Sequence, residues 1–346
     1  MSEVKRQVHL VGSLGLSDTE TVFRTIASIL GPYCPRIPDG ESGERQQWIT
    51  WQHATFNSNP DMEMAHDDVN STGLPGKVTP QFYQVRPSID PTTVRFGLLG
   101  YAEVALESFE IFRKLSSEGV ISPNTRFQVS LPTPVALLSY FVVPEQRLVL
   151  ETAIETAMLK EVEQIQKAIP AQQLALQWDA TFEVLGAAGG PQLPYPDAIE
   201  GSLRRLGHLN SFVKPEVQLG IHLCYGDLGH KHIVEPVDLA IAVAFANGFS
   251  ETGRRIDFIH MPVPANRRDD TYFRPLADWK LPACTRLILG LIHYSDGLEG
   301  SRRRIEVATR HAQEFDLSTE CGFGRRDPST IPALLEIHRK LAANEN

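Results

Sequence analysis

The sequence is poor in cysteine, with four in 346 residues. These cysteines lie far apart along the chain, so they give no disulfide framework and suit a reducing compartment. The chain also lacks any run of about eighteen apolar residues, the length that a membrane-spanning helix needs. Its first residues pass from polar side chains directly into an expected strand, without the apolar stretch of a secretory signal. We therefore expect a cytoplasmic protein.

Positive charge is also scarce. The 33 Lys and Arg residues are outnumbered by 42 Asp and Glu residues, which gives a formal net charge of -9. Nucleic acids and anionic membranes are bound through basic surfaces. The composition therefore predicts neither a nucleic acid nor a membrane as a partner, and it leaves a homo-oligomer open.

The sequence has no detectable internal repeat, no linker between domains and no Rossmann glycine fingerprint. Instead, apolar runs of strand length alternate with stretches of helical periodicity along the whole chain. Strands are expected from Arg36 and at residues 8–13, 125–133, 174–181, 217–223, 255–264, 285–293 and 315–323. Eight strand-helix units predict an α/β fold, a single (β/α)8 TIM barrel domain that spans residues 1–346.

Residues 53–95 interrupt this alternation. The stretch follows the second expected strand, is rich in Pro, Gly, Asn and Asp, and has no clear periodicity. Loops of this length within compact domains are commonly functional. We interpret residues 53–95 as a loop insertion that forms a lid over the barrel mouth.

A basic run, Arg302 to Arg304, falls in the helix expected after the seventh strand. Like charges in succession on a helix usually face water. The three arginines are therefore interpreted as a solvated helix face rather than as part of a site.

Active sites of TIM barrels lie at the carboxyl ends of the strands. The polar side chains near those ends of the expected strands are Ser13, Asp39, Glu41, Asp179, His222, Cys224, His260, His293 and Cys321. Several have a structural interpretation too: Asp39 can hold a turn, and His260 and His293 can be hydrogen-bonded core residues. An unpaired carboxylate at the end of an apolar strand is costly, which favours a site role for Asp179.

The most specific pattern is VQLGIHLCYGD, in which His222 and Cys224 end the fifth expected strand. Alternate residues of a strand face the same way, so a His-x-Cys step presents both side chains together. Cys321 ends the eighth expected strand. Imidazole and thiolate are the ligands that zinc prefers, and three protein ligands leave one position open, as in catalytic zinc sites. Alternatively, the cysteines are small buried apolar residues.

His222-x-Cys224 and the distant Cys321-Gly322 resemble the zinc signature of the cobalamin-independent methionine synthase family, in its catalytic C-terminal barrel. The resemblance implies a zinc-dependent thiol alkyltransferase. Its cofactor would be zinc, and its partners would be a small-molecule thiol and an alkyl donor. The zinc would hold the thiol as a thiolate, which attacks the donor carbon.

Two further segments resemble the same family. Val11-Gly12-Ser13 is similar to its Ile-Gly-Ser, which implies that the backbone at Gly12 and Ser13 binds a substrate carboxylate. Asp39-Gly40-Glu41 is similar to its His-Gly-Glu, which implies substrate binding at Asp39 and contact between Glu41 and a substrate amine.

Other positions depart from the family. Asp179 matches the aspartate of its Asp-Glu-Pro-Ala but continues as Ala-Thr-Phe, and Tyr140 replaces a tryptophan that stacks on folate. The sixth strand, IDFIHMPVP, lacks the carboxylate zinc ligand and offers His260. We interpret His260 either as a zinc ligand or as a residue hydrogen-bonded to one. These departures predict the same thiol chemistry with an electrophile other than methyl-folate.

Asp179 and His293 are the candidate catalytic residues. His293 lies near the end of the seventh expected strand. We assign it the exchange of a proton with the leaving group, because imidazole titrates near neutral pH.

Two other functions fit the same barrel. One is a metal-free enzyme of the uroporphyrinogen decarboxylase type, which would use Asp39 and basic side chains on an acidic substrate. The other is a non-catalytic binding barrel, in which His222 and Cys224 only pack. Metal content separates the zinc enzyme from both.

Overall fold

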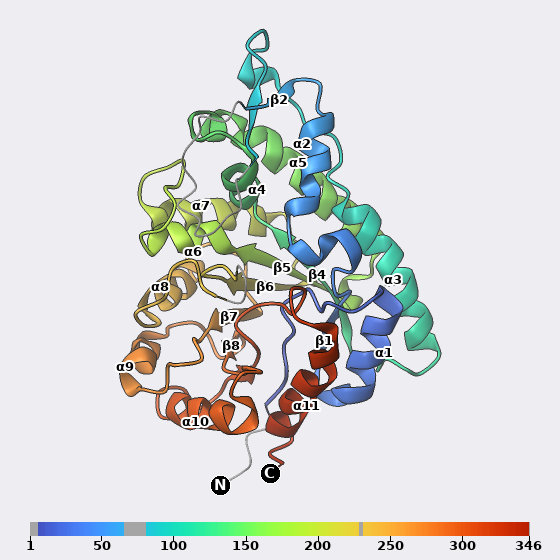
Figure 1. Ribbon diagram of the computed structural model, residues 1–346, viewed down its shortest axis with the longest axis vertical. Helices are drawn as coiled ribbons and strands as arrows, with labels where there is room; N and C mark the ends of the chain where they lie inside the picture. Colours follow the sequence, from blue (N-terminus) through green and yellow to red (C-terminus); the bar gives the residue numbers. More distant parts are fainter. Residues whose placement is uncertain (1–5, 66–80, 228–230, 346) are drawn as a thin grey trace.

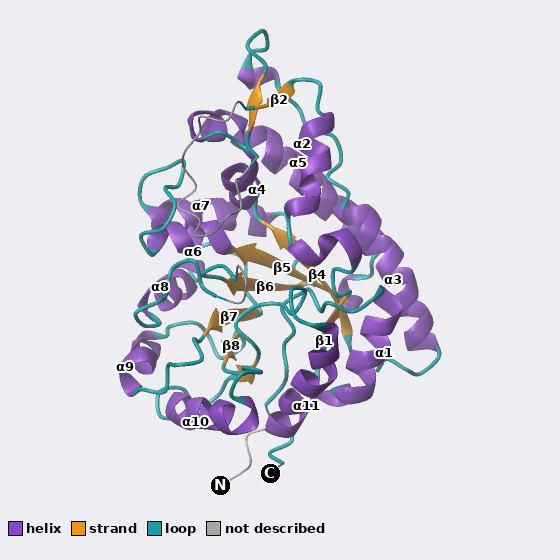
Figure 2. Cartoon of the chain, in the orientation of Figure 1, coloured by secondary structure: helices purple, strands orange, loops and turns teal. Residues whose placement is uncertain are grey.

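The computed structural model describes residues 6–65, 81–227 and 231–345. Seven parallel strands form its central sheet. In their order across the sheet they are β1 (Arg36–Pro38), β4 (Arg126–Pro132), β5 (Leu174–Ala180), β6 (Gln218–Leu223), β7 (Phe258–Pro262), β8 (Arg286–Gly290) and β9 (Asp316–Leu317). The sheet curls, and helices surround it (Figure 1, Figure 2). This is the TIM-barrel-like α/β fold that the sequence predicts.

The surrounding helices follow the strands in the expected alternation. They are α1 (Thr19–Ile29), α3 (Tyr101–Ser117), α4 (Pro134–Phe141), α5 (Arg147–Ala168), α6 (Thr181–Ala187), α7 (Ala198–Ser211), α8 (Ala240–Phe249), α9 (Asp270–Phe273), α10 (Gly297–Thr309) and α11 (Ile331–Ala342). Asp18 caps the start of helix α1, because its carboxylate accepts a hydrogen bond from the Thr21 backbone N–H at 2.8 Å. In the described parts of the chain, no helix is long and apolar enough to cross a membrane.

An extended segment, residues 8–13, takes the place of the first expected strand. Val8 bridges Leu317 of β9, and Ser13 bridges Gly40 just after β1. The segment therefore joins the two edges of the seven-stranded sheet and occupies the eighth position of the barrel.

Side-chain amides replace part of the backbone ladder along this segment. Gln128 of β4 donates to the carbonyl oxygens of Leu10 and Val11 at 2.9 and 3.0 Å. Gln177 of β5 donates to the same Val11 oxygen at 2.8 Å. Because these carbonyls are satisfied by buried glutamines, the segment closes the barrel without forming a regular strand.

The two faces of the strands differ in chemistry. Along β5, Leu176 and Trp178 belong to the main apolar core, whereas Gln177 and Asp179 are hydrogen-bonded to each other at 2.9 Å. Successive strand residues point to opposite faces. The apolar core therefore lies between the strands and the helices, and polar side chains from the strands face the inside of the barrel.

The insertion at residues 53–95 contains regular structure that the sequence interpretation missed. It includes α2 (His53–Ser58) and an antiparallel pair, β2 (Met62–Met64) and β3 (Tyr83–Val85). Phe56 stacks on Phe141 of α4 at 4.7 Å between ring centroids, and the pair of strands lies beyond the ring of helices (Figure 1). These elements are too short for their periodicity to be recognised. Residues 66–80 of the expected lid lie outside the described residues, and the lid stays a prediction.

The interpretation of the arginine run as a solvated face is wrong for Arg304. Its side chain is fully buried and forms an ion pair with Asp296 at 2.6 Å. It also donates to the carbonyl oxygens of Leu291 and Ala265, both at 2.7 Å. Arg303 is exposed, so adjacent arginines of α10 point to opposite sides of the helix.

Glu161 of α5 anchors the start of α3. Gly100 precedes helix α3 as its N-cap residue and offers no side chain to cap it. The buried Glu161 carboxylate accepts hydrogen bonds from the backbone N–H groups of Leu99 and Ala102 at 2.5 and 2.6 Å. It thus satisfies helix-terminal donors from a neighbouring helix.

We predict that Glu161→Ala lowers the free energy of unfolding by about 3 kcal/mol, because buried N–H groups lose a charged acceptor. Urea denaturation followed by circular dichroism measures the change. Glu163→Ala is the matched control, since Glu163 is exposed on the same helix and should change the value by less than about 0.5 kcal/mol. Equal effects of the two substitutions would contradict the anchoring role.

Candidate metal centre

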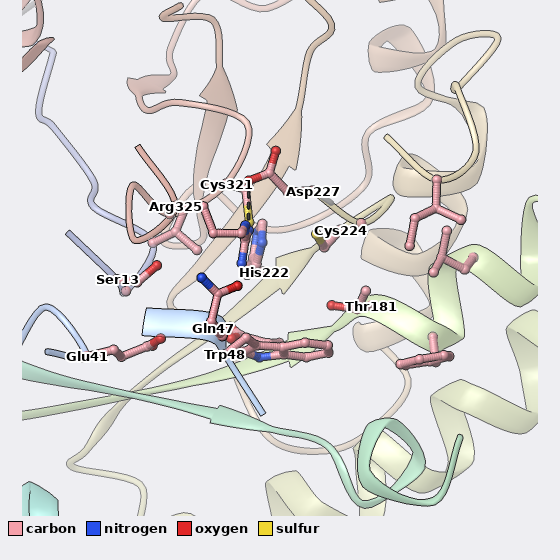
Figure 3. A pocket seen from close by; sticks show the side chains of 18 of the residues that line it. Ser13, Glu41, Gln47, Trp48, Thr181, His222, Cys224, Asp227, Cys321 and Arg325 are labelled. Atoms are coloured by element: carbon pink, nitrogen blue, oxygen red, sulfur yellow. Dashed lines mark hydrogen bonds and ion pairs between the residues drawn. The ribbon is translucent and has the colours of Figure 1, made fainter. Parts of the chain in front are cut away.

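A pocket lies at the carboxyl ends of the strands. Most of the residues that the sequence singled out line it, namely Gly12, Ser13, Glu41, Tyr140, Asp179, His222, Cys224 and Cys321. Figure 3 shows Ser13 and Glu41 at one side, with His222, Cys321 and Arg325 close to one another. Asp39, His260 and His293 are not among its lining residues.

The three candidate metal ligands come together from two strand ends. His222 belongs to β6, Cys224 follows that strand directly, and Cys321 lies in the loop after β9. Their ligand atoms lie within 4.8 Å of one another. Two sulfur ligands of a tetrahedral zinc lie about 3.8 Å apart, so small side-chain movements suffice for the three atoms to share one ion.

The hydrogen bonding and the protonation of His222 are those expected of a metal ligand. Its Nε2 is buried and has no hydrogen-bond partner, whereas its Nδ1 lies 2.6 Å from Nδ1 of His260. A buried polar atom without a partner is costly, and a metal ion would satisfy it. Burial lowers the pKa of His222 well below its usual value, which keeps the ring in the neutral form that binds metals.

The two thiols lie in contact. The hydrogen bond with Cys224, together with burial, raises the pKa of the Cys321 thiol well above its usual value. A bound metal cation would favour the thiolate form of Cys321. Soft thiolates with an imidazole form a donor set for zinc, so the residues present fit this ion.

An ion pair joins the two loops that carry these cysteines. Arg325, four residues after Cys321, contacts Asp227 at 2.7 Å, and Asp227 follows Cys224 by three residues. Both side chains are largely buried. The pair therefore holds the two cysteine-bearing loops together beside the pocket.

Glycines after Cys321 allow the loop to pack against the first segment of the chain. A Cβ atom on Gly322 would lie 2.4 Å from Ser13 Oγ and 3.1 Å from the Ser13 nitrogen. The Gly324 N–H donates to Ser13 Oγ at 3.1 Å, and the Phe323 N–H donates to the Ser13 carbonyl at 2.6 Å. Only a residue without a side chain permits this approach at position 322.

Glu41 and Asp179 line the pocket as carboxyl groups with raised pKa values. Burial and the nearby Asp179 raise the pKa of Glu41 to about 8. Burial also raises the pKa of Asp179 to about 7, although Gln177 donates to it at 2.9 Å. Groups with such pKa values can donate or accept a proton near neutral pH.

Asp39 holds the turn that presents Glu41. Its carboxylate accepts hydrogen bonds from the Glu41 backbone N–H and from Ser108 Oγ, both at 2.9 Å, and contacts Arg45 at 2.8 Å. Glu41 itself has a φ of 48°, a conformation that needs such support. The structure thus places Asp39 behind the pocket, in the turn-forming role that the sequence left open.

The other two histidines lie behind the pocket wall. His260 is fully buried, and its Nε2 lies 2.9 Å from the Thr319 carbonyl oxygen. His293 Nε2 lies 2.8 Å from the Val263 carbonyl oxygen. Burial lowers the pKa of His293 to about 3, so this residue is neutral, and it does not line the pocket.

Trp48 and Phe182 form an aromatic wall that the sequence analysis missed. Their rings are nearly parallel, with centroids 6.5 Å apart. Trp48 follows the short helical turn Gly43–Gln47 and has a φ of 60°. Its segment has no periodicity, so only the presence of two tryptophans, Trp48 and Trp51, in a polar stretch could have drawn attention to it.

No model of a protein family matches the sequence, and no curated protein matches it. Solved structures do match over nearly the whole chain. A B12-independent methionine synthase from a Shewanella species, solved in complex with selenomethionine, is 14% identical with a TM-score of 0.59 and covers 99% of this chain and 98% of its own. A putative vitamin-B12 independent methionine synthase from Listeria monocytogenes is 15% identical with a TM-score of 0.55 and covers 96% of each chain.

A methyltransferase from Methanosarcina mazei is 11% identical with a TM-score of 0.57, and the match covers 99% of this chain and 95% of that one. This chain has the fold of these proteins. At such low identity the similarity establishes the fold, and the chemistry has to be argued from the pocket.

We predict that Gly322→Ala lowers the affinity for zinc at least tenfold, because the new methyl group pushes the Cys321 loop away from Ser13. Competition with a chromophoric chelator measures the affinity. Gly97→Ala is the matched control, since a Cβ atom there meets no atom within 4 Å. Equal affinities of the two variants would show that the close packing of the loop is not required.

We also predict that the metal-free protein loses stability as the pH rises. Asp and Glu titrate near pH 4 in an unfolded chain, whereas the folded pKa values of Asp179 and Glu41 are about 7 and about 8. The folded state therefore binds these protons more tightly, and the stability that they contribute is full below about pH 4 and lost by about pH 8.

Glu41→Gln should flatten the decline in the free energy of unfolding between these pH values, as measured by urea denaturation of the metal-free protein. Glu44→Gln in the same turn is the control, because Glu44 is exposed, and it should leave the decline unchanged. A wild-type protein whose stability rises over this range would refute the prediction.

Proposed function

We propose that this protein transfers an alkyl group to the sulfur of a small-molecule thiol, using a zinc ion held by His222, Cys224 and Cys321. The observation that carries the proposal is the group of three ligand atoms within 4.8 Å at the wall of a pocket, with His222 Nε2 buried and unpartnered. The shared fold with B12-independent methionine synthases, one of them in complex with selenomethionine, supports it.

In this proposal the metal ligands and the two carboxyl groups of the pocket have different roles. A zinc ion held by His222, Cys224 and Cys321 would favour the thiolate form of a substrate thiol near neutral pH. Glu41 and Asp179 exchange protons with the substrates, because their pKa values lie near neutrality. We assign this exchange to them rather than to His293, whose ring nitrogen faces the Val263 carbonyl.

The apolar part of the pocket lining binds the alkyl donor in this proposal. Trp48, Phe182 and Tyr140 contribute aromatic rings, and Leu185 adds aliphatic surface. Such a lining aligns the donor carbon with the sulfur and keeps water away from both. We therefore propose a donor with an apolar body, and an electrophile other than methyl-folate.

The rival functions find less support in the pocket. A metal-free decarboxylase would need Asp39 and basic side chains, but Asp39 is engaged by Arg45 and Ser108. Among the described residues that line the pocket, Arg325 is the one arginine or lysine, and it is paired with Asp227. A non-catalytic barrel would leave His222 Nε2 without a partner at a cost in stability.

We predict about one zinc per chain by elemental analysis of the purified protein. Cys224→Ser and Cys321→Ser should each remove most of it, because thiolates dominate the affinity of such sites. Cys284→Ser is the matched control, since Cys284 is exposed and outside the pocket. Full zinc occupancy in both pocket variants would reject the ligand assignment.

The reaction itself is tested by incubating the zinc-loaded protein with a panel of small thiols and alkyl donors. Mass spectrometry then detects the thioether product. Cys321→Ser should lower the rate at least a hundredfold relative to Cys284→Ser. A rate that survives the loss of zinc would refute zinc-dependent transfer.

A further inference from the structure

His260 connects the two parts of the chain that carry the candidate metal ligands. Its Nδ1 lies 2.6 Å from Nδ1 of His222 on β6, and its Nε2 lies 2.9 Å from the carbonyl oxygen of Thr319. Thr319 precedes Cys321 by two residues. Both ring nitrogens of His260 are therefore engaged, and neither is available to the metal while these contacts last.

The partners of His260 determine where the protons lie. A backbone carbonyl can only accept a hydrogen bond, so the Nε2 of His260 carries a proton. A neutral imidazole carries one proton, which leaves Nδ1 of His260 as an acceptor. The proton in the contact between the two rings then belongs to His222, on its Nδ1. His222 is left with a bare Nε2, the buried atom that has no protein partner.

The other protonation state is disfavoured by burial. If His260 carried protons on both nitrogens, it would be a cation with 0% of its surface exposed. Its two hydrogen-bond partners are an imidazole and a carbonyl, and neither is an anion. A buried charge without an opposite charge in contact is strongly unfavourable, so the neutral form of His260 remains.

We propose that His260 is a positioning residue, which accepts the Nδ1 proton of His222 and thereby fixes the tautomer and the ring orientation that offer His222 Nε2 to the metal. Ligand histidines commonly donate their second N–H to a carboxylate, a carbonyl or water. Here a neutral imidazole is the acceptor, so the ligand is oriented without adding negative charge to the site. The inference deepens the proposed zinc function, and its consequence for metal binding rests on that function.

Three substitutions separate the two contacts of His260. His260→Asn places an amide oxygen near the position of Nδ1 and retains an acceptor for His222. His260→Gln retains a donor for the Thr319 carbonyl but places no acceptor at Nδ1. His260→Leu removes both contacts. His338→Asn is the control, because His338 is equally buried but contacts the Leu334 carbonyl in α11.

The first measurement is made on the metal-free protein and needs no activity. Nitrogen-15 NMR of labelled histidine, with the His222 signal identified through His222→Asn, shows which ring nitrogen is protonated. We expect the proton on Nδ1 in the wild type, in His260→Asn and in the control, and a mixture of tautomers in His260→Gln and His260→Leu. A proton on Nε2 of His222 in the wild type would overturn the proposal.

The second measurement is zinc affinity by chelator competition. His260→Gln and His260→Leu should bind zinc about 10-fold to 100-fold more weakly, whereas His260→Asn and the control should stay near the wild type. Unchanged affinity in a folded His260→Gln protein would also overturn the proposal, even if His260→Leu fails to fold. If the wild type has its proton on Nδ1 but binds no zinc, the tautomer assignment stands and the proposed zinc function fails.

Discussion

The packing of the Cys321 loop against Ser13 is the constraint on which the rest of the site depends. Residues 8–13 close the barrel between β9 and β1, and the loop after β9 lies directly on that closing segment. The position of the loop therefore depends on the closing segment. Cys321 reaches His222 and Cys224 because β9 and β6 belong to the same curled sheet, with β7 and β8 between them. The ligand set is thus a property of the whole fold, although each ligand belongs to a short motif.

A second feature of the structure is the number of polar side chains buried inside the barrel. His222, His260 and Gln177 occupy the inside of the barrel, where each hydrogen bond is strong and each unsatisfied atom is costly. Most of these groups are paired with one another or with backbone carbonyls. Among the buried polar atoms that have no hydrogen-bond partner is His222 Nε2, the atom that the proposed metal would use.

The strands, and the residues that meet at their ends, could be predicted because two simple rules govern them. Alternation along a strand placed His222 and Cys224 together, and the common polarity of parallel strands placed Cys321 at the same edge. What a side chain contacts behind the strand follows from three-dimensional packing. The burial of Arg304, the turn role of Asp39 and the orientation of Trp48 depend on such contacts between distant segments. No local pattern encodes them.

His260 lies directly beside the proposed ligand His222. On β7 it pairs in register with His222 of β6, and the Nδ1 atoms of the two rings are 2.6 Å apart. In the proposed site the two thiolates balance the charge of zinc before substrate binds, and His260 adds none. A substrate thiolate would therefore be held more firmly and be less nucleophilic than beside an additional carboxylate. Such a nucleophile would suit a reactive electrophile, in keeping with the proposed donor other than methyl-folate.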